Sequence, residues 1–424
     1  MTRVRAFGSD TFRSLRNRNF RLFFIGQGLS QNGTWMQLVA IDILVLRLTD
    51  DGVAVGLATA ARFAPMILLG PWAGLLSDRS DRHKLLLWLA AAGAIVASIF
   101  AGTVATGHAS VGWIYVLAAV SGTVTALENP PRRAFVTDLV EPQEVTNAVG
   151  LNSAMMTGAK VVGPAIAGVL ITTLGVTWCF VINALSYLPQ LALFARLDRS
   201  RFHAGERITK AKGQLREGFR YMWRTPELRL PMLLVAAIGT MTFNYPVILP
   251  LFATRDLASG AGTYTLLLSV MSIGSVAGSL FVARRTEITS RFLAVGALAL
   301  AASCFALASA PGVAVAALLT IPIGVSTMLV MSGSNSLVQL TATPAMRGRM
   351  LAMQAVVFVG STPVGAPIIG AIAEHAGARW ALAVGGLTAL AAGGTTLRAV
   401  ARIDRSDRGD DRRHASVRPA SAAA

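Results

Sequence analysis

Twelve long apolar stretches follow one another along the chain, and they constrain its fold more than any other feature. Each has about 20 residues or more, the length that a helix needs to cross the hydrocarbon core of a bilayer. They cover residues 20–46, 53–76, 84–106, 111–130, 147–171, 178–197, 230–253, 262–283, 291–310, 313–338, 350–373 and 379–400. Of the 424 residues 54% are hydrophobic and only 14% are charged, too few to cover a soluble globule of this size. We therefore predict an all-α membrane protein with twelve transmembrane helices.

The basic residues lie on alternate connections between these stretches. The net charge is +17, and 33 of the 38 Lys and Arg residues fall on connections that share one side if the spans alternate. Arg47, Arg255 and Arg379 lie on the opposite connections, and Arg62 and Lys160 lie inside spans. By the positive-inside rule we expect both termini in the cytoplasm of a bacterium, with the protein in its inner membrane. A nucleic-acid partner would need one basic face with interleaved aromatic residues, which seven scattered loops do not make.

Enzyme chemistry finds no support in the residue pattern. The chain lacks a phosphate-binding Gly-X-X-X-X-Gly-Lys-Ser/Thr loop, and its histidines form no close ligand pair. Cys179 and Cys304 lie in or beside apolar spans with no metal-ligand spacing. The arginine-rich first 18 residues do not resemble a cleaved signal peptide. We expect no enzyme activity, no metal and no cofactor.

A polar stretch between the sixth and seventh spans divides the chain into two halves. The predicted organisation is a cytoplasmic segment (1–19), a six-helix bundle (20–197), a cytoplasmic linker (198–229), a second six-helix bundle (230–400) and a basic disordered tail (401–424). Within the linker, apolar and basic residues alternate at helical spacing: Leu215, Phe219, Met222 and Trp223 against Arg216, Arg220 and Arg224. This pattern favours either an amphipathic helix at the membrane surface or a solvated connecting helix.

The two halves repeat each other. At an offset of 202 residues one set of positions matches another: Pro142, Gly163, Gly168, Gly175 and Trp178 against Pro344, Gly365, Gly370, Gly377 and Trp380. At an offset of 204, Gly70 and Gly74 match Gly274 and Gly278. Parallel six-span repeats are typical of transporters whose two bundles rock about a site near the bilayer midplane. We therefore predict two pseudo-symmetric bundles.

Several segments in order resemble the major facilitator superfamily, and most of all its drug and siderophore exporters, the relatives of the enterobactin exporter and the macrolide-efflux proteins. The resemblance covers about residues 12–400. Its segments are LRNRNFRLFFIGQGLSQNGTWM, LGPWAGLLSDRSDRHK, NPPRRAFVTDLVEPQEVTNAVGLNSA, GPAIAG and LREGFRYMWRTPELR. It implies the major facilitator fold, a transported small molecule and no ATP site.

The turn between the second and third spans resembles the signature loop of that superfamily. Gly74, Asp78, Arg79 and Arg82 take the expected places, whereas Asp81 replaces a usual glycine and His83 with Lys84 replaces the second basic residue. The resemblance implies a latch that closes the cytoplasmic side, with Asp78 meeting the start of the eleventh span near Arg347 and Arg349. In the second half Val282 stands where Asp78 would be, so the latch is one-sided. A solvated turn that only sets topology is the alternative.

The fifth span carries a version of the superfamily's antiporter motif. The small or kinking residues are Gly150, Ala159, Gly163, Pro164, Ala167 and Gly168, and the second half has a looser version at Gly365, Pro367 and Gly370. Small residues let membrane helices approach closely, and a proline bends its helix. The motif predicts a smooth face that closes the periplasmic side, and ordinary small-residue packing is the alternative.

Ionisable residues inside spans are candidate coupling or cavity residues, because charges at membrane depth are costly unless they are paired or line a cavity. Lys160 lies near the middle of the fifth span, where either a cavity or coupling role or a structural ion pair would explain it. Asp42 and Arg62 lie at similar depth and could pair, and Glu128 fits a gating pair or a proton site. Polar residues at helical spacing could line a cavity or join helices: Gln27, Ser30, Gln31 and Thr34 in the first span, Asn244 in the seventh, and Asn335 and Gln339 in the tenth.

These observations lead to one functional prediction and two rivals. We expect a monomeric secondary active transporter that works by proton antiport and alternating access. It would export a small amphipathic or hydrophobic organic molecule such as a drug, siderophore or secondary metabolite. Its partners would be that substrate, protons and the lipid bilayer. An importer of a small nutrient on the same fold, and a membrane sensor or scaffold that transports nothing, are the alternatives.

Overall fold

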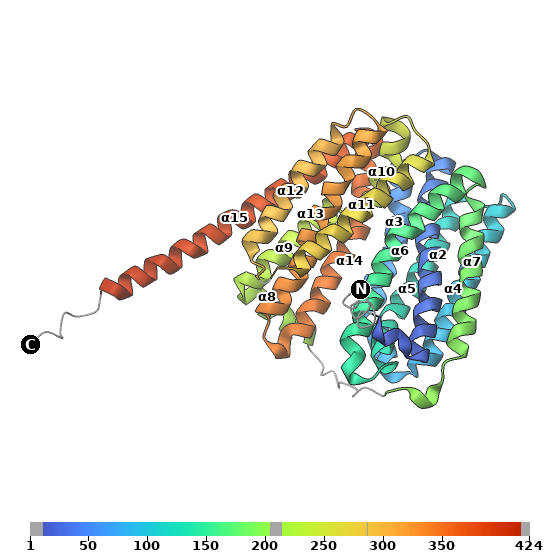
Figure 1. The fold of residues 1–424 in the computed structure, drawn as a ribbon. Helices are drawn as coiled ribbons and strands as arrows, with labels where there is room; N and C mark the ends of the chain where they lie inside the picture. The colour runs from blue at the N-terminus through green and yellow to red at the C-terminus, as the bar shows by residue number, and fades with distance from the viewer. Residues whose placement is uncertain (1–11, 204–213, 286, 417–424) are drawn as a thin grey trace, which may run out of the picture.

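The computed structural model describes residues 12–203, 214–285 and 287–416, and they form two helical bundles side by side (Figure 1). The first bundle consists of α2 (Arg18–Thr49), α3 (Gly52–Arg79), α4 (Arg82–Ala105), α5 (Val111–Asp138), α6 (Val145–Thr173) and α7 (Thr177–Ala195). A connecting helix, α8 (Gln214–Arg224), leads to the second bundle. That bundle consists of α9 (Pro226–Met241), α10 (Tyr245–Leu251), the π-helix η4 (Phe252–Asp256), α11 (Ala261–Ala283), α12 (Ser290–Ala308), α13 (Val313–Thr341), α14 (Pro344–His375) and α15 (Ala378–Ser416).

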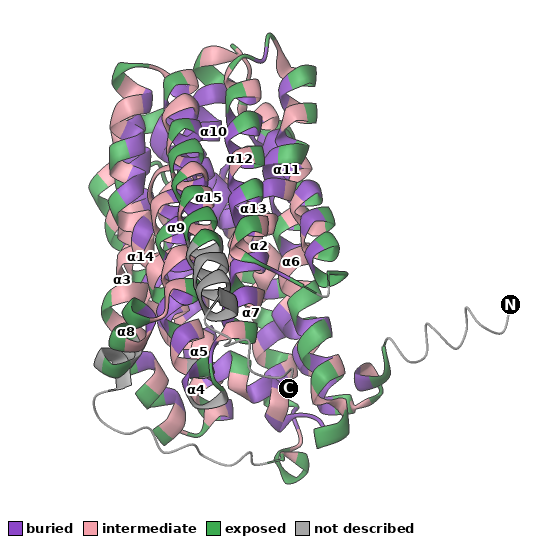
Figure 2. Cartoon of the chain, turned by 90° about the vertical axis from the view of Figure 1, so that its left-hand side faces the viewer, coloured by how far each residue is buried: buried purple, intermediate pink, exposed green. Residues whose placement is uncertain are grey.

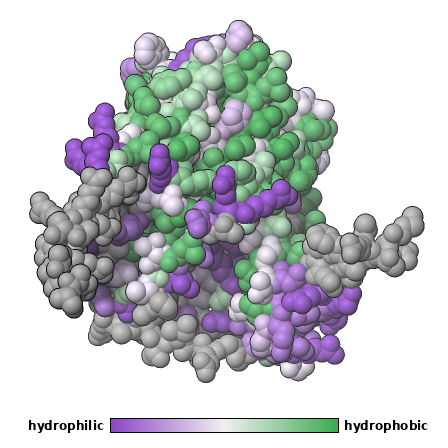
Figure 3. Space-filling model, turned by 60° about the vertical axis from the view of Figure 1, so that its left-hand side comes forward, coloured by the Kyte–Doolittle hydropathy of each residue, from purple (hydrophilic) through white to green (hydrophobic). Residues whose placement is uncertain are grey.

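The outer surface of the bundles is that of a membrane protein. Large apolar side chains are exposed, including Trp88 at 76% and Leu68 at 70%, which is unfavourable in water and favourable in lipid. Buried residues line the inside of the bundles, and exposed ones follow the outer helix faces (Figure 2). Hydrophobic side chains cover much of the upper part of the face in Figure 3, and hydrophilic ones gather toward the lower end.

Within the described residues, eleven helices are long and apolar enough to cross a membrane. The helix expected as the first span, α2, does not reach that hydropathy although it has 32 residues, about 48 Å of helix. Its buried face includes the polar residues Gln27, Ser30 and Gln37, which lower its mean hydropathy. It packs against α6 and α7, so it completes the first bundle as an interior helix.

The internal repeat is visible in the packing. A Cβ at Gly122 of α5 would overlap the backbone of Arg62 in α3, and one at Gly324 of α13 would overlap the backbone of Met271 in α11. The chain leaves α6 and α14 through Gly175 and Gly377, whose φ angles of +97° and +98° strain any residue with a Cβ. These glycine pairs are 202 residues apart, the offset found in the sequence.

Three expectations about elements are corrected. The seventh span is interrupted between α9 and α10, because Pro246 has no N–H to donate to the carbonyl four residues earlier. The fourth span, expected over residues 111–130, continues as α5 through Pro130 and Pro131 to Asp138. The chain beyond residue 400, expected to be disordered, continues α15 to Ser416, and no proline interrupts that part of the sequence. Residues 1–11, 204–213 and 417–424, parts of the expected terminal and linker segments, lie outside the described residues.

Candidate functional site

The two bundles meet tightly in one half of the molecule. We call this the far end: it holds Asp50, Gly175 and Gly377, whereas the linker end holds Asp81 and α8. At the far end α3 packs on α14, where a Cβ at Gly52 would lie 2.9 Å from the carbonyl oxygen of Gly370. On the other side of the molecule α6 meets α11, where a Cβ at Gly168 would overlap the side chain of Thr265. Small residues thus bring four helices into close contact across the boundary between the bundles.

The antiporter-type motif of α6 divides between two kinds of contact. Gly163 packs on the backbone of Asn32 and the Cβ of Trp35 in α2, within the first bundle, and Pro164 is buried beside it. Gly168 makes the contact across the boundary, while a Cβ at Gly150 would meet open space. The second half repeats this division, because Gly365 packs on Thr240 within its own bundle and Gly370 on Gly52 of the other.

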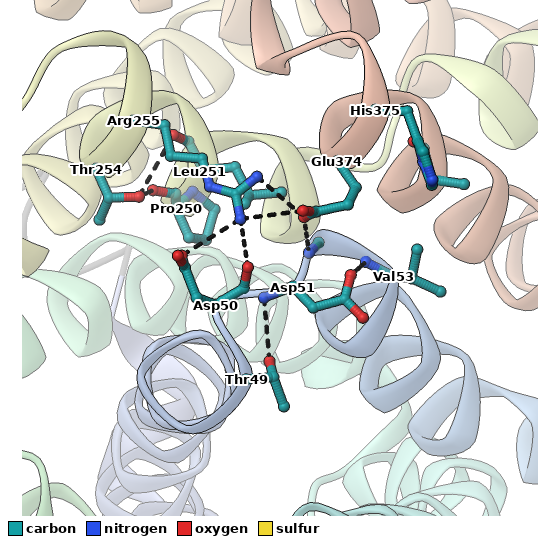
Figure 4. Close-up of polar contacts among 12 residues, drawn as sticks. Thr49, Asp50, Asp51, Val53, Pro250, Leu251, Thr254, Arg255, Glu374 and His375 are labelled. Atoms are coloured by element: carbon teal, nitrogen blue, oxygen red, sulfur yellow. Dashed lines mark hydrogen bonds and ion pairs between the residues drawn. The ribbon is translucent and has the colours of Figure 1, made fainter.

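A cluster of charged residues ties the bundles together at the far end (Figure 4). The guanidinium of Arg255, in the π-helix η4, lies 2.9 Å from a carboxylate oxygen of Glu374 in α14 and 3.3 Å from one of Asp50. It also donates to the backbone carbonyl of Asp50, and Glu374 accepts from the backbone N–H of Gly52 at 2.7 Å. Asp50 ends α2 with a left-handed backbone (φ 47°). We call Arg255, Asp50, Glu374 and Gly52 the far-end clasp.

The sequence did not predict this clasp. Arg255 stands out in it only as one of three basic residues on the sparsely charged side. Its partners are 205 and 119 residues away along the chain, so no local spacing links them. Their position beside turns at the ends of apolar spans was the one available signal.

Lys160 lies halfway along α6, at the border between the tight and the open half. Its side chain is exposed, its Nζ lies 5.6 Å from the centroid of the Trp35 ring, and its backbone carbonyl accepts from the hydroxyl of Ser272 in α11 at 3.2 Å. Toward the linker end a Cβ at Gly158 or Gly150 would meet nothing within 4 Å. Lys160 is therefore accessible, and no ion pair with a described carboxylate holds it.

Asp42 is buried, at 3% exposure, and it forms a contact between the bundles that the sequence did not predict. Its Oδ2 accepts a hydrogen bond of 2.9 Å from the hydroxyl of Tyr264, which belongs to α11 of the second bundle. Asp42 and Arg62 both line a small cavity, but the Arg62 guanidinium does not come within ion-pair distance of the Asp42 carboxylate. One terminal nitrogen of Arg62 lacks a partner among the described residues. Asp42 and Arg62 are thus neighbours, but they do not form the direct ion pair that the sequence suggested.

Glu128 takes part in a polar chain inside the first bundle. Gln190 donates to Gln27 at 3.0 Å, Gln27 donates to Glu128 at 3.1 Å, and the Nε of Arg132 lies 3.7 Å from the same carboxylate oxygen of Glu128. Arg132 also donates to Asn129 at 2.7 Å. Glu128 and Gln27 were candidate site residues in the sequence. Arg132 and Gln190 were not predicted.

The predicted gating loop connects helices within the first bundle in this conformation. Arg82 forms an ion pair of 2.8 Å with Asp138 at the end of α5, Arg79 is exposed, and Gly74 and Asp78 are half-buried. Arg349, the expected receiver of the latch, lies 2.6 Å from Glu217 of α8, and Arg347 is exposed. The latch stays a prediction.

The residues that depart from the family loop have structural roles. The Asp81 carboxylate caps α4 by accepting from the backbone N–H of Lys84 at 3.1 Å. Partial burial acts to raise the pKa of Asp81, but that hydrogen bond and the positive charge of Arg199 outweigh it and hold the pKa below its ordinary value. His83 is buried, bonded to the carbonyl of Phe194 at 2.7 Å and stacked on Phe135.

Among the described residues, the buried polar side chains of the second bundle are uncharged. Asn244 lies in the break between α9 and α10 and donates to the carbonyl of Thr240 at 2.7 Å, while its own amide oxygen lacks a partner among the described residues. Gln354 donates to Ser334 at 2.8 Å, a buried pair that the sequence analysis did not select. Asn335 and Gln339 are exposed, and Gln31 in the first bundle is half-buried.

Helix α8 has two distinct faces. Met222 packs with Met346 and Met350 of α14, whereas Phe219 and Trp223 are stacked on each other and about half exposed. Arg229 lies over the Trp223 ring at 5.9 Å. The helix is amphipathic as expected, and the side chains of Leu215 and Arg216 lie outside the described ones.

Two parallel helical bundles with a polar, charged interior and close glycine contacts across their boundary define a membrane transporter of the major facilitator fold. The model of a protein family described as transmembrane secretion effector matches residues 9–418, and the chain belongs to this family of major facilitator transporters. Its members are transporters and not enzymes, and the chain is accordingly a multi-pass membrane protein.

Relatives and solved structures agree with this class. The chain is 24% identical over 270 residues to a staphyloferrin A transporter of Staphylococcus aureus, covering 61% of this chain and 66% of that one. It is 26% identical over 156 residues to macrolide efflux protein A of Streptococcus pyogenes, covering 36% and 37%. The chain thus matches less than two thirds of the length of these relatives. A bacterial homologue of the human lysosomal transporter Spinster has the same fold, with a TM-score of 0.69 at 16% identity over 91% of this chain and 96% of that one.

Proposed function

We propose that the protein exports a small amphipathic or hydrophobic organic molecule from the bacterial cytoplasm in exchange for protons. The observation that carries the proposal is the conformation of the site. The bundles meet at the far end, and Lys160 is accessible beside unfilled space that extends toward the linker end. The positive-inside pattern assigns the linker end to the cytoplasm, so a substrate would reach Lys160 from inside the cell.

Lys160 would attract an acidic group of the substrate. Its ammonium group has an aromatic neighbour, Trp35, and no described carboxylate within ion-pair distance, so an incoming anion would meet an uncompensated positive charge. The relatives named for staphyloferrin A transport and macrolide efflux support a small organic molecule as the substrate.

Protons would drive the cycle through carboxylates of the first bundle. Asp42 and Glu128 lie inside its helices, whereas at the corresponding depth the second bundle presents amide and hydroxyl groups such as Asn244 and Ser334. When a buried carboxylate is protonated, it loses its charge, and the free energy needed to separate it from its polar partners falls. The protein would work as a monomer, since both bundles and their boundary belong to one chain.

Transport into inside-out membrane vesicles tests this function. Vesicles with an acidic lumen should accumulate labelled staphyloferrin A or a labelled macrolide, and a protonophore should abolish the accumulation. Lys160→Met should reduce transport of the acidic probe by tenfold or more, since it removes a charge-assisted contact, whereas Lys160→Arg should retain most of it. Uptake in the opposite direction would support an importer, and no flux and no proton movement over a broad panel would support a sensor or scaffold.

A further inference from the structure

The far end contains a cavity between the two bundles. Its volume is about 550 Å³, and both bundles contribute to its wall. Arg47 and Asp50 come from the end of α2, Arg255 comes from η4, and Tyr264 comes from α11. We call this cavity the vestibule. Its charged residues make it a place for water, which needs several polar partners to occupy a cavity.

Tyr264 connects the vestibule with the buried carboxylate of Asp42. Tyr264 is one of the residues around the vestibule, its side chain is fully buried, and its hydroxyl donates to Asp42 Oδ2 at 2.9 Å. The ionisable groups that face Asp42 are this hydroxyl from α11 and the guanidinium of Arg62 from α3. Arg47, Asp50 and Arg255 are the charged groups farther out, in the vestibule wall. Tyr264 therefore lies between the vestibule and Asp42.

The same hydrogen bond also helps to close the far end. Tyr264 belongs to the second bundle and Asp42 to the first, so the bond must break when the bundles separate there. A hydrogen bond to an ionised carboxylate is roughly twice as strong as one between neutral groups. Protonation of Asp42 would weaken the bond and would also remove its attraction to Arg62.

We propose that the contact between Tyr264 and Asp42 couples proton arrival to opening of the far end. A hydronium ion that reaches Asp42 gives its proton to the carboxylate oxygen Oδ2, which accepts the Tyr264 hydrogen bond. The carboxylate becomes a neutral carboxyl group, the phenol keeps its own proton, and a water molecule is left. The neutral Asp42 holds Tyr264 less strongly, and the far end opens. The inference rests on the proposed proton antiport and assigns Tyr264 as its positioning residue.

Tyr245 provides a matched control. It is a second buried tyrosine, and its hydroxyl lies 3.3 Å from the hydroxyl of Thr327. Both residues belong to the second bundle, so this contact does not cross the boundary. Tyr245→Phe removes the same atom as Tyr264→Phe without touching the proposed coupling contact.

Distances between spin labels at the far end test the proposal without a transported substrate. Labels would be placed at Leu174, at the end of α6, and Ala376, at the end of α14, after Cys179→Ala and Cys304→Ala substitutions; both label sites are exposed. In lipid nanodiscs the parent should populate a longer distance as the pH falls from 8 to 5. Asp42→Asn should populate the longer distance at every pH. Tyr264→Phe should raise the population of the longer distance at pH 8 by roughly tenfold, the factor expected for a hydrogen bond to a charged group. Its pH profile should be flatter than that of the parent.

The outcomes separate the inference from the proposed function. Tyr245→Phe should follow the parent profile. A Tyr264→Phe profile equal to that of the parent, or a pH response that survives in Asp42→Asn, would overturn the coupling role, whatever the vesicles transport. Infrared titration adds a second measurement: the carboxyl band that Asp42→Asn removes should titrate at a different pH in Tyr264→Phe, and an unchanged midpoint would contradict the proposal. A normal pH response without proton-driven flux would instead contradict the antiport.

Discussion

The two bundles share a backbone plan but differ in where they carry charge. Gly163 and Gly365 pack inside their own bundles, while Gly168 and Gly370 pack across the boundary. In contrast, the half-buried Glu128 and the buried Arg132 of α5 form an ion pair, and the residues 202 positions later are Val330 and Ser334. Ser334 instead accepts a hydrogen bond from Gln354.

This difference separates two requirements on the molecule. Rocking of two bundles needs close, smooth helix contacts on both sides, and the packing of small residues is accordingly repeated. A change of charge needs only one responsive bundle, and buried charges are costly in a membrane. The first bundle thus holds the ionisable interior, and the second supplies neutral partners such as Tyr264.

The largest expected effect concerns the charged interior. Glu128→Gln leaves the buried Arg132 without its carboxylate, which should lower the free energy of unfolding by about 3 kcal/mol. Ser334→Ala at the equivalent place in the second bundle should cost only about 1 kcal/mol, the value of a neutral hydrogen bond. Thermal unfolding in detergent measures both. The double variant Glu128→Gln, Arg132→Gln should regain stability, and equal losses for Glu128→Gln and Ser334→Ala would contradict the asymmetry.

The close glycine packing between the bundles should tolerate larger side chains poorly. Gly168→Leu places a side chain against Thr265, and overpacking of about 1–3 kcal/mol would shift the closing equilibrium by about 5- to 150-fold. We expect transport to be nearly lost and the far end to stay open in the spin-label measurement. Gly150→Leu is the control, because its Cβ meets open space. Full transport by Gly168→Leu would show that this face does not need to close.

The far-end clasp should contribute less to closure of the far end than the packing at Gly168 does. Arg255→Gln removes ion pairs to Asp50 and Glu374, and partly exposed pairs each contribute at most about 1 kcal/mol. The far-end-open population should therefore rise severalfold, and high salt should produce part of the same effect in the parent. Arg47→Gln, which changes another arginine of the vestibule wall, should have a smaller effect. Equal effects of the two variants would mean that overall charge matters rather than the clasp.

The smallest expected effect distinguishes two helix caps. Asp81 caps α4, and Thr289 caps α12 by accepting from the backbone N–H of Phe292. Replacing either with Ala should cost about 1 kcal/mol at neutral pH. The pKa of Asp81 is lowered in the folded protein, so its stabilisation is present above its ordinary pKa and is lost as the pH falls through the folded value, below about pH 4. Unfolding curves between pH 3 and 6 should therefore converge for the parent and Asp81→Ala, but remain separated for Thr289→Ala.

Local pattern was sufficient for most of the architecture. Apolar stretches predicted the spans because crossing a bilayer requires a minimum helix length, and the offset of 202 residues predicted the repeat that Gly175 and Gly377 display in their backbone angles. The pattern of apolar residues did not predict the break between α9 and α10, which Pro246 causes. It also did not predict that α2 is less apolar than the other spans, because polar residues occupy its buried face.

Residue patterns along the chain were enough to predict a membrane protein with two related bundles and a transporter superfamily, because apolar length, loop charge and glycine spacing can be read without the fold. They also indicated Lys160, Asp42 and Glu128, because an ionisable residue within an apolar span is conspicuous. The contacts of these residues depend on how the helices pack. The bond from Tyr264 to Asp42 joins positions 222 residues apart, and the packing of one bundle on the other, not any spacing along the chain, brings them together.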